Sequence, residues 1–485
     1  MCLTDCLVLP SDGVANDGSD TLKDVGPGLV TGFVSLAVAD MLSFGSSFVP
    51  STATPKAAES KTFYVDSDHG SDEANGLSPG SAWKSLRKAR AAVLKPGDSM
   101  LFARSSVWRG QLSVQTGNAT HTTVYGAYGD ASLPKPLFIG ALSASAESDW
   151  VQQPGSDVWA MGSVGQKYAS IMDRDMHDID FDLRDIGNLI LDGEKSVGWR
   201  VWAPDELKKQ DQWYYAASVN SHLRGRNETK LYYYSPAGNP ARVHHTIECA
   251  WMNFEQADLI AFTDVSHVTV EFLMVKYTGS SAMGGGNLSH FMLRDCDISW
   301  AGGACIEPGP RFPRNPLECT RYGNAVDIWE WSSNVEVYSN RLWECYDTGF
   351  TNQGTSGNYT EFNISYHHNV VGHTEYCFEV WDQNHPATGW NSTGWPRNAS
   401  SMSEIRIEQN VCVDSGGGWS HQQRPDPSGR HICMFSNTAS VSNISILNNI
   451  FFQTVPYSAG WWMEDVSTKQ SQHNSLSGYI SEIFM

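Results

Sequence analysis

Two acidic residues stand at comparable points of two strand-like segments. Asp327 lies in Ala-Val-Asp-Ile-Trp and Glu379 in Cys-Phe-Glu-Val-Trp, each flanked by apolar residues. Because side chains alternate along a strand, both carboxylates are predicted to point away from the apolar side. Thr351 holds the same place in the segment between them, Gly-Phe-Thr-Asn-Gln. If these segments stack, the backbones of the two acids lie roughly 9–10 Å apart, near the separation that inverting glycoside hydrolysis uses.

A second pair of acids, Asp347 and Glu375, precedes two of these segments at matching corners. Stacking would bring them to about 5 Å, near the separation used in retaining hydrolysis. Close carboxylates raise the pKa of one partner, which suits a general acid. The alternative for either pair is solvated surface charge, or carboxylates that accept hydrogen bonds from backbone N–H groups at the corners.

Further polar and aromatic residues accompany these acids. Carboxylates, amides and indoles on one face are typical of a sugar subsite, because flat apolar rings stack on pyranose faces. A polar, cationic segment also follows the Glu379 strand, and functional loops on rigid scaffolds have this character. Its alternative is a loop held by its own ion pairs. The candidate substrate-binding residues are Trp329, Glu330, Asn352, Gln353, Trp381, Asp382, His421, Arg424, Arg430 and His431.

These residues belong to a stretch that repeats. Each copy has alternating apolar residues, then an Asn, then a second apolar pair, and an earlier copy places Asp295 or Asp297 near the Asn position. A period between twenty and fifty residues with strand alternation predicts a parallel β-solenoid, with an Asn that tolerates left-handed dihedrals at the corner. An antiparallel sandwich is the alternative, but it would not repeat a corner Asn. The aligned residues are Asn340, Asn369, Asn410 and Asn449.

The rest of the chain is divided around this coil. Residues 1–60 are expected to be a leader, either targeting or disordered, and 61–465 the coil. A small β-rich insertion with an antiparallel hairpin is expected at about 140–245, and a tail or cap at 466–485. Ala82 to Leu94 reads as an amphipathic helix that covers the open end of the coil.

Composition restricts the partners. A net charge of −20 and a pI near 5.1 argue against nucleic acid and anionic membrane surfaces. No segment is apolar enough for a membrane span. Ten cysteines show no metal-ligand spacing, so no metal site is predicted, and Cys345 with Cys377 is the first disulfide pair to test. Eight glycosylation sequons favour a secreted protein, which we expect to be a monomer.

Several short segments carry a resemblance. Tyr64-Val-Asp, Pro96-Gly-Asp and Trp108-Arg-Gly, together with Gly323 to Trp329, resemble right-handed parallel β-helix proteins of the pectate-lyase-like superfamily. The stretch 186–240 is similar to the insertion of β-helix glycosidase-like proteins, among them glycoside hydrolase family 141. The resemblance covers roughly 62–465 and implies an all-β, single-stranded right-handed parallel β-helix. It transfers no catalytic residue, because such folds host hydrolases, lyases, epimerases and binding modules.

Three functions follow from these observations. The first is a glycoside hydrolase without a cofactor, acting on a plant or algal oligo- or polysaccharide through Asp327 and Glu379, with Asp347 and Glu375 as the second pair. The alternative is a polysaccharide lyase or uronate epimerase assisted by Ca²⁺, with the cationic segment supplying the base. The third is a non-catalytic β-helix that binds glycans.

Overall fold

The computed structural model describes residues 60–172, 183–216, 230–253, 258–307, 320–355, 358–382, 400–425, 427–436, 440–453, 460–463, 469–472 and 475–478. The expected leader, 1–60, lies outside them except for its last residue. Residues 60–485 form one compact unit. Among the described residues, none forms a helix long and apolar enough to cross a bilayer.

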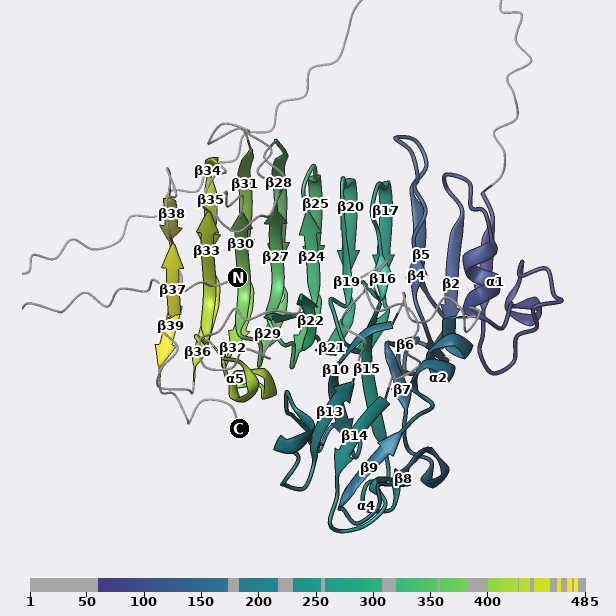
Figure 1. The fold of residues 1–485 in the computed structure, drawn as a ribbon. Coiled ribbons are helices and arrows are strands. Elements are labelled where there is room, and N and C mark those ends of the chain that lie inside the picture. Colours follow the sequence, from purple (N-terminus) through teal and green to yellow (C-terminus); the bar gives the residue numbers. More distant parts are fainter. Residues whose placement is uncertain are drawn as a thin grey trace, which may run out of the picture. The chain divides into compact units, whose positions relative to one another are not determined.

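Three long sheets, parallel throughout, build a coil (Figure 1). In hydrogen-bonded order, the first sheet contains β1 (Thr62–Val65), β2 (Ser99–Ala103), β5 (Thr123–Tyr128), β17 (Ser266–Glu271), β20 (Ser289–Arg294), β25 (Ser333–Tyr338), β28 (Thr360–His367), β31 (Ser401–Glu408), β35 (Ile444–Leu447) and β38 (Lys469–Gln472), with β34 (Ser440–Ser442) beside β31. The second sheet contains β3 (Val107–Arg109), β6 (Leu137–Ile139), β18 (Met274–Thr278), β21 (Asp297–Ala301), β26 (Arg341–Trp343), β29 (Val370–Gly372), β32 (Val411–Val413), β36 (Ile450–Gln453) and β39 (Ser475–Gly478). The third sheet contains β4 (Leu112–Ser113), β16 (Ile260–Ala261), β19 (Met283–Gly286), β24 (Val326–Trp329), β27 (Thr348–Gly354), β30 (Tyr376–Asp382), β33 (Arg430–Ser436) and β37 (Gly460–Met463).

Strand alternation fills the coil. In β25 the side chains of Val335 and Val337 are buried, and Ile364 and Tyr366 of β28 follow them in register. Each turn leaves an apolar inner face that only the next turn covers, so stacking creates one continuous core. The predicted parallel β-helix is confirmed by these ladders.

The repeated Asn residues form a buried ladder of side chains at one corner. Oδ1 of Asn410 accepts hydrogen bonds from N and Nδ2 of Asn369, both at 3.0 Å, and Oδ1 of Asn369 accepts from Asn340 in the same way. The expectation of left-handed dihedrals at the Asn itself is wrong. The preceding residue has the positive φ in every copy, at Ser339, His368, Gln409 and Asn448.

The earlier copy of this corner holds a cysteine in place of an Asn. Asp297 pairs with Arg341, which aligns Cys296 with Asn340. The backbone N of Cys296 donates to Oδ1 of Asn340 at 2.9 Å. Neither Asp295 nor Asp297 therefore takes the corner position.

A short helix lies at the amino-terminal end of the coil (Figure 1). α1 (Leu86–Ala91) begins after Ser85, whose side chain accepts a hydrogen bond from the backbone N of Lys88. Leu86 and Ala89 are buried against the coil. The predicted amphipathic helix is confirmed, and it is shorter than expected because Ser85 is its N-cap.

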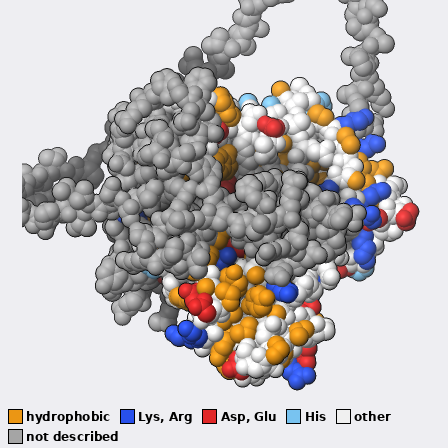
Figure 2. All heavy atoms as spheres, in the orientation of Figure 1, with side chains coloured by type: hydrophobic (Ala, Val, Ile, Leu, Met, Phe, Trp, Pro, Cys, Tyr) orange, Lys and Arg blue, Asp and Glu red, His pale blue; other side chains and the backbone are white. Residues whose placement is uncertain are grey.

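Two antiparallel-rich sheets interrupt the coil. The predicted hairpin is confirmed by the pairing of Trp213 with Tyr233. One sheet contains β7 (Ala141–Ser143), β15 (Ile247–Asn253), β10 (Leu183–Leu191) and β11 (Ser196–Val197), and the other β8 (Val151–Gln152), β9 (Val158–Met161), β14 (Lys230–Tyr234), β13 (Gln212–Ala216) and β12 (Trp199–Arg200). Because β15 pairs with β10, the interruption extends to Asn253. Figure 2 shows hydrophobic side chains gathered over this part of the surface.

Smaller elements complete the described part. The helices are α2 (Val164–Met172), α4 (Pro240–Val243) and α5 (Trp419–Gln423), with 3-10 turns at Pro79–Ser81, Glu147–Asp149 and Pro204–Glu206. β22 (Ala304–Glu307) and β23 (Thr320–Tyr322) form an antiparallel pair.

The buried cysteines differ from the expected pairing. Cys345 and Cys377, the first pair to test for a disulfide, are both free. The Cys345 thiol contacts the carbonyl of Trp343 at 3.8 Å, whereas Cys377 faces Ser415 and His431. Cys305 is disulfide-bonded.

Candidate active site

The third sheet places one residue of each successive turn in a single column. The ladder pairs Gly284 with Asp327, Asp327 with Thr351, and Thr351 with Glu379. The predicted alignment of Asp327, Thr351 and Glu379 is therefore confirmed. Two strand spacings separate the backbones of the two acids, roughly 9–10 Å.

Asp327 is a buried carboxyl with several donors. Asp327 is only 4 % exposed, and Nδ2 of Asn324 donates a hydrogen bond to its Oδ1 at 2.6 Å. Burial raises the pKa of Asp327 to about 6, and the negative charge of Asp347 contributes to the rise. Hydrogen bonds from Ser281, Asn324 and the Trp329 indole act in the opposite direction, because they stabilise the ionised form.

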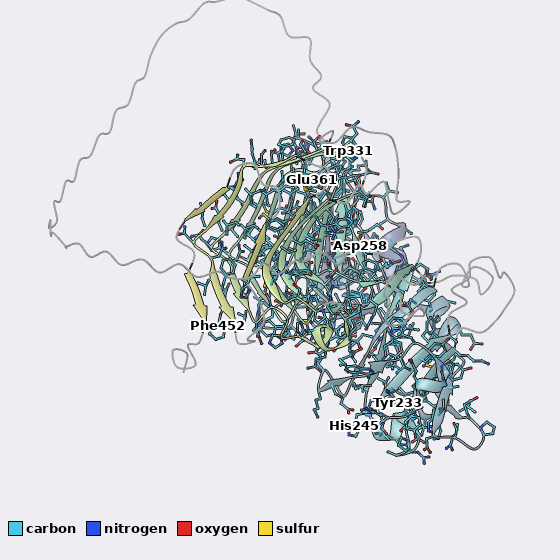
Figure 3. The ribbon with its side chains drawn as sticks, turned by 60° about the vertical axis from the view of Figure 1, so that its left-hand side comes forward. Tyr233, His245, Asp258, Trp331, Glu361 and Phe452 are labelled. Carbon is cyan, nitrogen blue, oxygen red and sulfur yellow. The ribbon has the colours of Figure 1, made fainter. Side chains whose placement is uncertain are left out.

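Asp258 is a functional candidate that sequence reasoning missed. It is half-buried and lies just before β16. Figure 3 shows Asp258 within the coil, well separated from Tyr233 and His245 of the insertion. Its carboxyl covers Gly284, where an added Cβ would lie 2.5 Å from Oδ1 of Asp258. Gly284 pairs with Asp327, so the position that the Asp258 carboxyl covers is one strand spacing, roughly 5 Å, from the backbone of Asp327.

The two carboxyls have different surroundings. Burial, and then the negative charge of Asp327, raise the pKa of Asp258 well above its ordinary value. Within the described part of the chain, no hydrogen-bond donor to the Asp258 carboxyl offsets this rise, whereas Asp327 has three. Of the two carboxyls, Asp258 therefore holds its proton more strongly, and Asp327 is the first to ionise.

Glycine makes room for this pair. Met283 to Gly286 contains three successive glycines on a ladder whose neighbouring strands carry large side chains. A run of this kind leaves space that another group must fill. The three glycines were the sequence signal for an open space in this sheet. The residue that fills the space, Asp258, comes from a different turn and could not be identified from the sequence spacing.

Glu379 binds three neutral donors. Oε2 accepts hydrogen bonds from Oγ1 of Thr348 at 3.3 Å, from Oγ1 of Thr351 at 3.1 Å and from Nε2 of Gln353 at 3.2 Å. Donors that converge on one oxygen stabilise negative charge there. Glu379 thus places a second carboxylate on the far side of Thr351 from Asp327.

The second predicted pair has a different role. The backbone N of Glu375 donates to the carbonyl of Asp347 at 2.9 Å, so the two corners are adjacent as expected. Their carboxylates, however, bind separate basic side chains: Oδ1 of Asp347 binds Arg424 at 3.0 Å, and Oε2 of Glu375 binds His421 at 3.0 Å. The backbone N of Gly429 also donates to Glu375, at 2.7 Å.

These contacts decide the protonation of Glu375. Burial acts to raise its pKa, but the charge of Arg424 and the hydrogen bonds of His421 and Ser428 outweigh it and leave the pKa lowered. The expectation that crowding would raise a pKa in this pair is therefore wrong at Glu375. Its carboxylate anchors the segment that contains α5 to the coil.

The outward column beside the acids carries aromatic rings. Trp329 pairs with Gln353, and Gln353 with Trp381, and all three side chains are half-buried. Glu330 follows Trp329 and accepts hydrogen bonds from the backbone N and the hydroxyl of Thr355. The side chain of Asp382 lies outside the described part of the structure.

Asn352 is not on this face. Its Nδ2 donates to Oε2 of Glu361 at 2.9 Å, and its Oδ1 accepts from the hydroxyl of Tyr366 at 2.9 Å. Both partners are buried, and Glu361 is labelled in Figure 3. The prediction was wrong because Asn352 shares the strand parity of Phe350, which points inward.

The cationic segment also differs from expectation. Arg424 has a side chain that is 6 % exposed and binds Asp347, and His421 binds Glu375. The backbone N of Arg430 donates to the carbonyl of Glu375 at 2.9 Å. His431 is fully buried inside the coil, so its prediction as a substrate-binding residue is wrong.

Part of the chain is similar in sequence to a known protein. No family model matches the chain. A lacto-N-biosidase of Bifidobacterium longum subsp. longum is 33% identical over 120 residues, which are 24% of this chain. The chain spans 7% of the length of that curated relative.

Solved structures give weak overall similarity. The complex of XylC with xylose has 11% sequence identity and a TM-score of 0.46, with 80% of this chain and 68% of that chain covered. A GH136 lacto-N-biosidase from Eubacterium ramulus has 13% identity and a TM-score of 0.29, with 86% and 67% covered. Scores of this size carry no conclusion about the site.

Proposed function

We propose that this protein is a glycoside hydrolase in which Asp258 is the general acid and Asp327 the nucleophile. The observation that carries the proposal is the pair of neighbouring carboxyls with unequal surroundings: among the described residues, Asp327 has three hydrogen-bond donors and Asp258 has none. Environments that separate two pKa values in this way assign the acid and the base. The two carboxyls come from neighbouring positions of the third sheet, and such a close pair favours a retaining mechanism over the wider pair of Asp327 and Glu379.

The reaction proceeds in two balanced steps. Asp258 gives its proton to the glycosidic oxygen while Asp327 bonds to the anomeric carbon, so the C–O bond to the leaving group breaks and a glycosyl-enzyme forms. Asp258, now ionised, takes a proton from water, which attacks the anomeric carbon and releases Asp327. Both carboxyls then return to their starting states.

The surroundings favour a neutral glycan. Trp329 and Trp381 offer apolar rings, and Gln353 lies between them in the same column. Asp327 and Glu379 would repel a uronate, and in the described part of the chain two nearby basic side chains, His421 and Arg424, bind Glu375 and Asp347. This charge distribution disfavours the lyase and epimerase alternatives, which need a free cation or a bound Ca²⁺ beside the substrate carboxylate.

A panel of aryl glycosides tests the proposal, with a lacto-N-bioside included because of the curated relative. We expect release of the aryl group without an unsaturated product, insensitivity to chelator, and loss of at least about 10³-fold in kcat for Asp327→Asn and Asp258→Asn. Asp205→Asn, at an exposed position of the insertion, is the control. Ultraviolet absorbance that grows with time and disappears with chelator would instead identify a lyase. If the wild type binds glycan without turnover, and the variants bind it equally well, the protein is a binding module.

Product stereochemistry separates the two carboxyl pairings. Hydrolysis through Asp258 and Asp327 retains the anomeric configuration, whereas the wider pair of Asp327 and Glu379 would invert it. Proton NMR of the first-formed sugar reports this directly. Inversion, with activity lost in Glu379→Gln and kept in Asp258→Asn, would reassign the acid and the base.

A further inference from the structure

Four polar side chains meet inside the coil, beneath the α5 segment. Cys377 is the second residue of β30, Cys412 lies in β32, Ser415 follows β32, and His431 lies in β33. Each of the four is fully buried. They come from two successive turns at the corner between the second and third sheets.

Their atoms are spaced as metal ligands are. Sγ of Cys377, Sγ of Cys412 and a ring nitrogen of His431 all lie within 4.8 Å of one another. Sγ of Cys377 is 3.7 Å from Nδ1 of His431. A tetrahedral zinc ion, with about 2.3 Å to sulfur and about 2.1 Å to nitrogen, requires about 3.6 Å between those two ligands.

Ser415 forms hydrogen bonds with two of these side chains. Oγ of Ser415 lies 3.1 Å from Sγ of Cys377 and 2.9 Å from Nδ1 of His431. Nδ1 is therefore the ring atom that faces the sulfurs, while Nε2 of His431 is buried with no hydrogen-bond partner in the described part of the chain. The ring is oriented for ligation through Nδ1.

From this geometry we propose a structural site for a thiophilic metal ion, with Zn²⁺ as the matching ion, ligated by Cys377, Cys412 and His431 beside the hydroxyl of Ser415. Two thiolates and one imidazole are the donors that Zn²⁺ prefers over Ca²⁺ or Mg²⁺. Ligation releases two thiol protons to solvent, with no change of oxidation state. The sequence prediction of no metal site used linear spacing, which cannot detect ligands from separate turns.

The site would join two turns beneath the candidate active site. Cys377 is two residues after Glu375 and two before Glu379, and His431 directly follows Arg430. Full burial leaves no path for exchange in the folded state, so the ion enters during folding. A metal there would hold β30 and β33 in register without contacting substrate.

Metal content of the full-length protein tests the proposal. We expect about one zinc per chain after refolding with Zn²⁺ under reducing conditions, and thiolate-to-cobalt charge-transfer absorption after refolding with Co²⁺. Cys412→Ser and His431→Gln are expected to lose the ion and melt at lower temperature. Cys345→Ser, which removes another buried free cysteine, is the control and should keep the ion.

Two results would overturn the site. One is wild-type protein that refolds with native circular dichroism and contains no metal. The other is a Cys377–Cys412 disulfide in peptide mapping of protein that was kept reduced until folding was complete. If Cys412→Ser does not fold, the wild type still decides, because protein that refolds with Co²⁺ and shows no thiolate-to-cobalt charge-transfer band would overturn the site.

Discussion

The carboxyl of Asp258 occupies the space that a side chain at Gly284 would need. A Cβ on Gly284 would lie 2.5 Å from Oδ1 and 2.7 Å from Cγ of Asp258. The obstacle is the end of one side chain, which can rotate away at low cost, and the φ angle of Gly284 is not in the left-handed region. A methyl group at this position therefore displaces the proposed acid more than it disturbs the fold.

We predict that Gly284→Ala lowers kcat/KM by about 10- to 100-fold, because a displacement of about 1 Å at a reacting group costs this much. The melting temperature should change little. Gly80→Ala is the matched control, since an added Cβ there meets nothing within 4 Å. Steady-state kinetics and thermal melts of both variants check the prediction, and unchanged kinetics in Gly284→Ala would remove Asp258 from the mechanism.

The pH dependence of activity follows from the same pair. Asp327 must be ionised and has a pKa raised to about 6, so kcat/KM should fall as pH decreases through about 6. Asp258 must be protonated and its pKa is raised well above the ordinary value, so the alkaline limb belongs to it. Because the two groups interact, the apparent pKa values of the two limbs belong to the pair and not to either residue alone.

A profile of kcat/KM against pH for the wild type checks this expectation. Asp258→Asn removes the titrating group of the alkaline limb, so its residual activity should lose that limb and keep the acid one. A wild-type profile that stays flat from pH 5 to pH 8 would contradict the proposed protonation states.

Strand parity explains how much of this site the sequence could reveal. The column of Asp327, Thr351 and Glu379 was predictable because side chains alternate with a period of two and the turns stack in register. The same alternation along β27 places the side chain of Asn352 inside the coil. Its prediction as a substrate-binding residue was wrong because it rested on the polar side chain and not on the position in the strand. Polar residues enter such a core when, as here, Glu361 and Tyr366 supply partners.

Contacts between turns were beyond sequence reasoning. The ion pairs of Asp347 with Arg424 and of Glu375 with His421 join residues 77 and 46 positions apart. Asp258 reaches its place over Gly284 from another turn in the same way. Irregular connections set these distances, and their lengths carry no periodic signal.

The insertion contains a histidine between two carboxylates. Nδ1 of His244 is 2.8 Å from Oδ2 of Asp192, and Nε2 is 3.0 Å from Oδ1 of Asp211. Hydrogen bonds to Asp211, together with that to Asp192, raise the pKa of His244 above 6.5, although burial opposes the rise. The hydrogen bonds from His244 and Tyr233 outweigh burial at Asp211 and lower its pKa to about 2.

These directions define a pH window for stability. The contribution of His244 is fully present below its unfolded pKa, near 6.5, and is lost as pH rises through the higher folded value. The contribution of Asp211 is present above 3.8 and is lost as pH falls toward 2. We predict that His244→Gln is less stable than wild type by about 1–3 kcal/mol at pH 5.5, and that the difference shrinks by pH 9.

His245→Gln is the matched control, because its side chain is exposed beside His244. Hydrogen exchange of the insertion strands at both pH values measures the effect locally, since the insertion can open separately from the coil. If His244→Gln loses the same amount of stability at pH 5.5 and at pH 9, then packing, and not the charged pair, supplies the stability.

The buried Asn ladder should be costly to interrupt. Asn410→Ala leaves the N–H groups of Asn369 and the carbonyl of Tyr366 without their side-chain partners inside the coil. Since an unsatisfied buried polar group costs about 1–3 kcal/mol, we predict a loss of about 2–4 kcal/mol in the free energy of unfolding. Urea denaturation followed by tryptophan fluorescence measures this loss.

Gln409→Asn separates the ladder from the backbone conformation of the same corner. Gln409 is exposed and has a φ of 54°, a region that Asn occupies more readily than Gln. This variant should be as stable as the wild type or slightly more so, because the ladder is intact and the corner is relieved. If Asn410→Ala were as stable as Gln409→Asn, water would be replacing the missing amide, and the corner Asn would define register without contributing to stability.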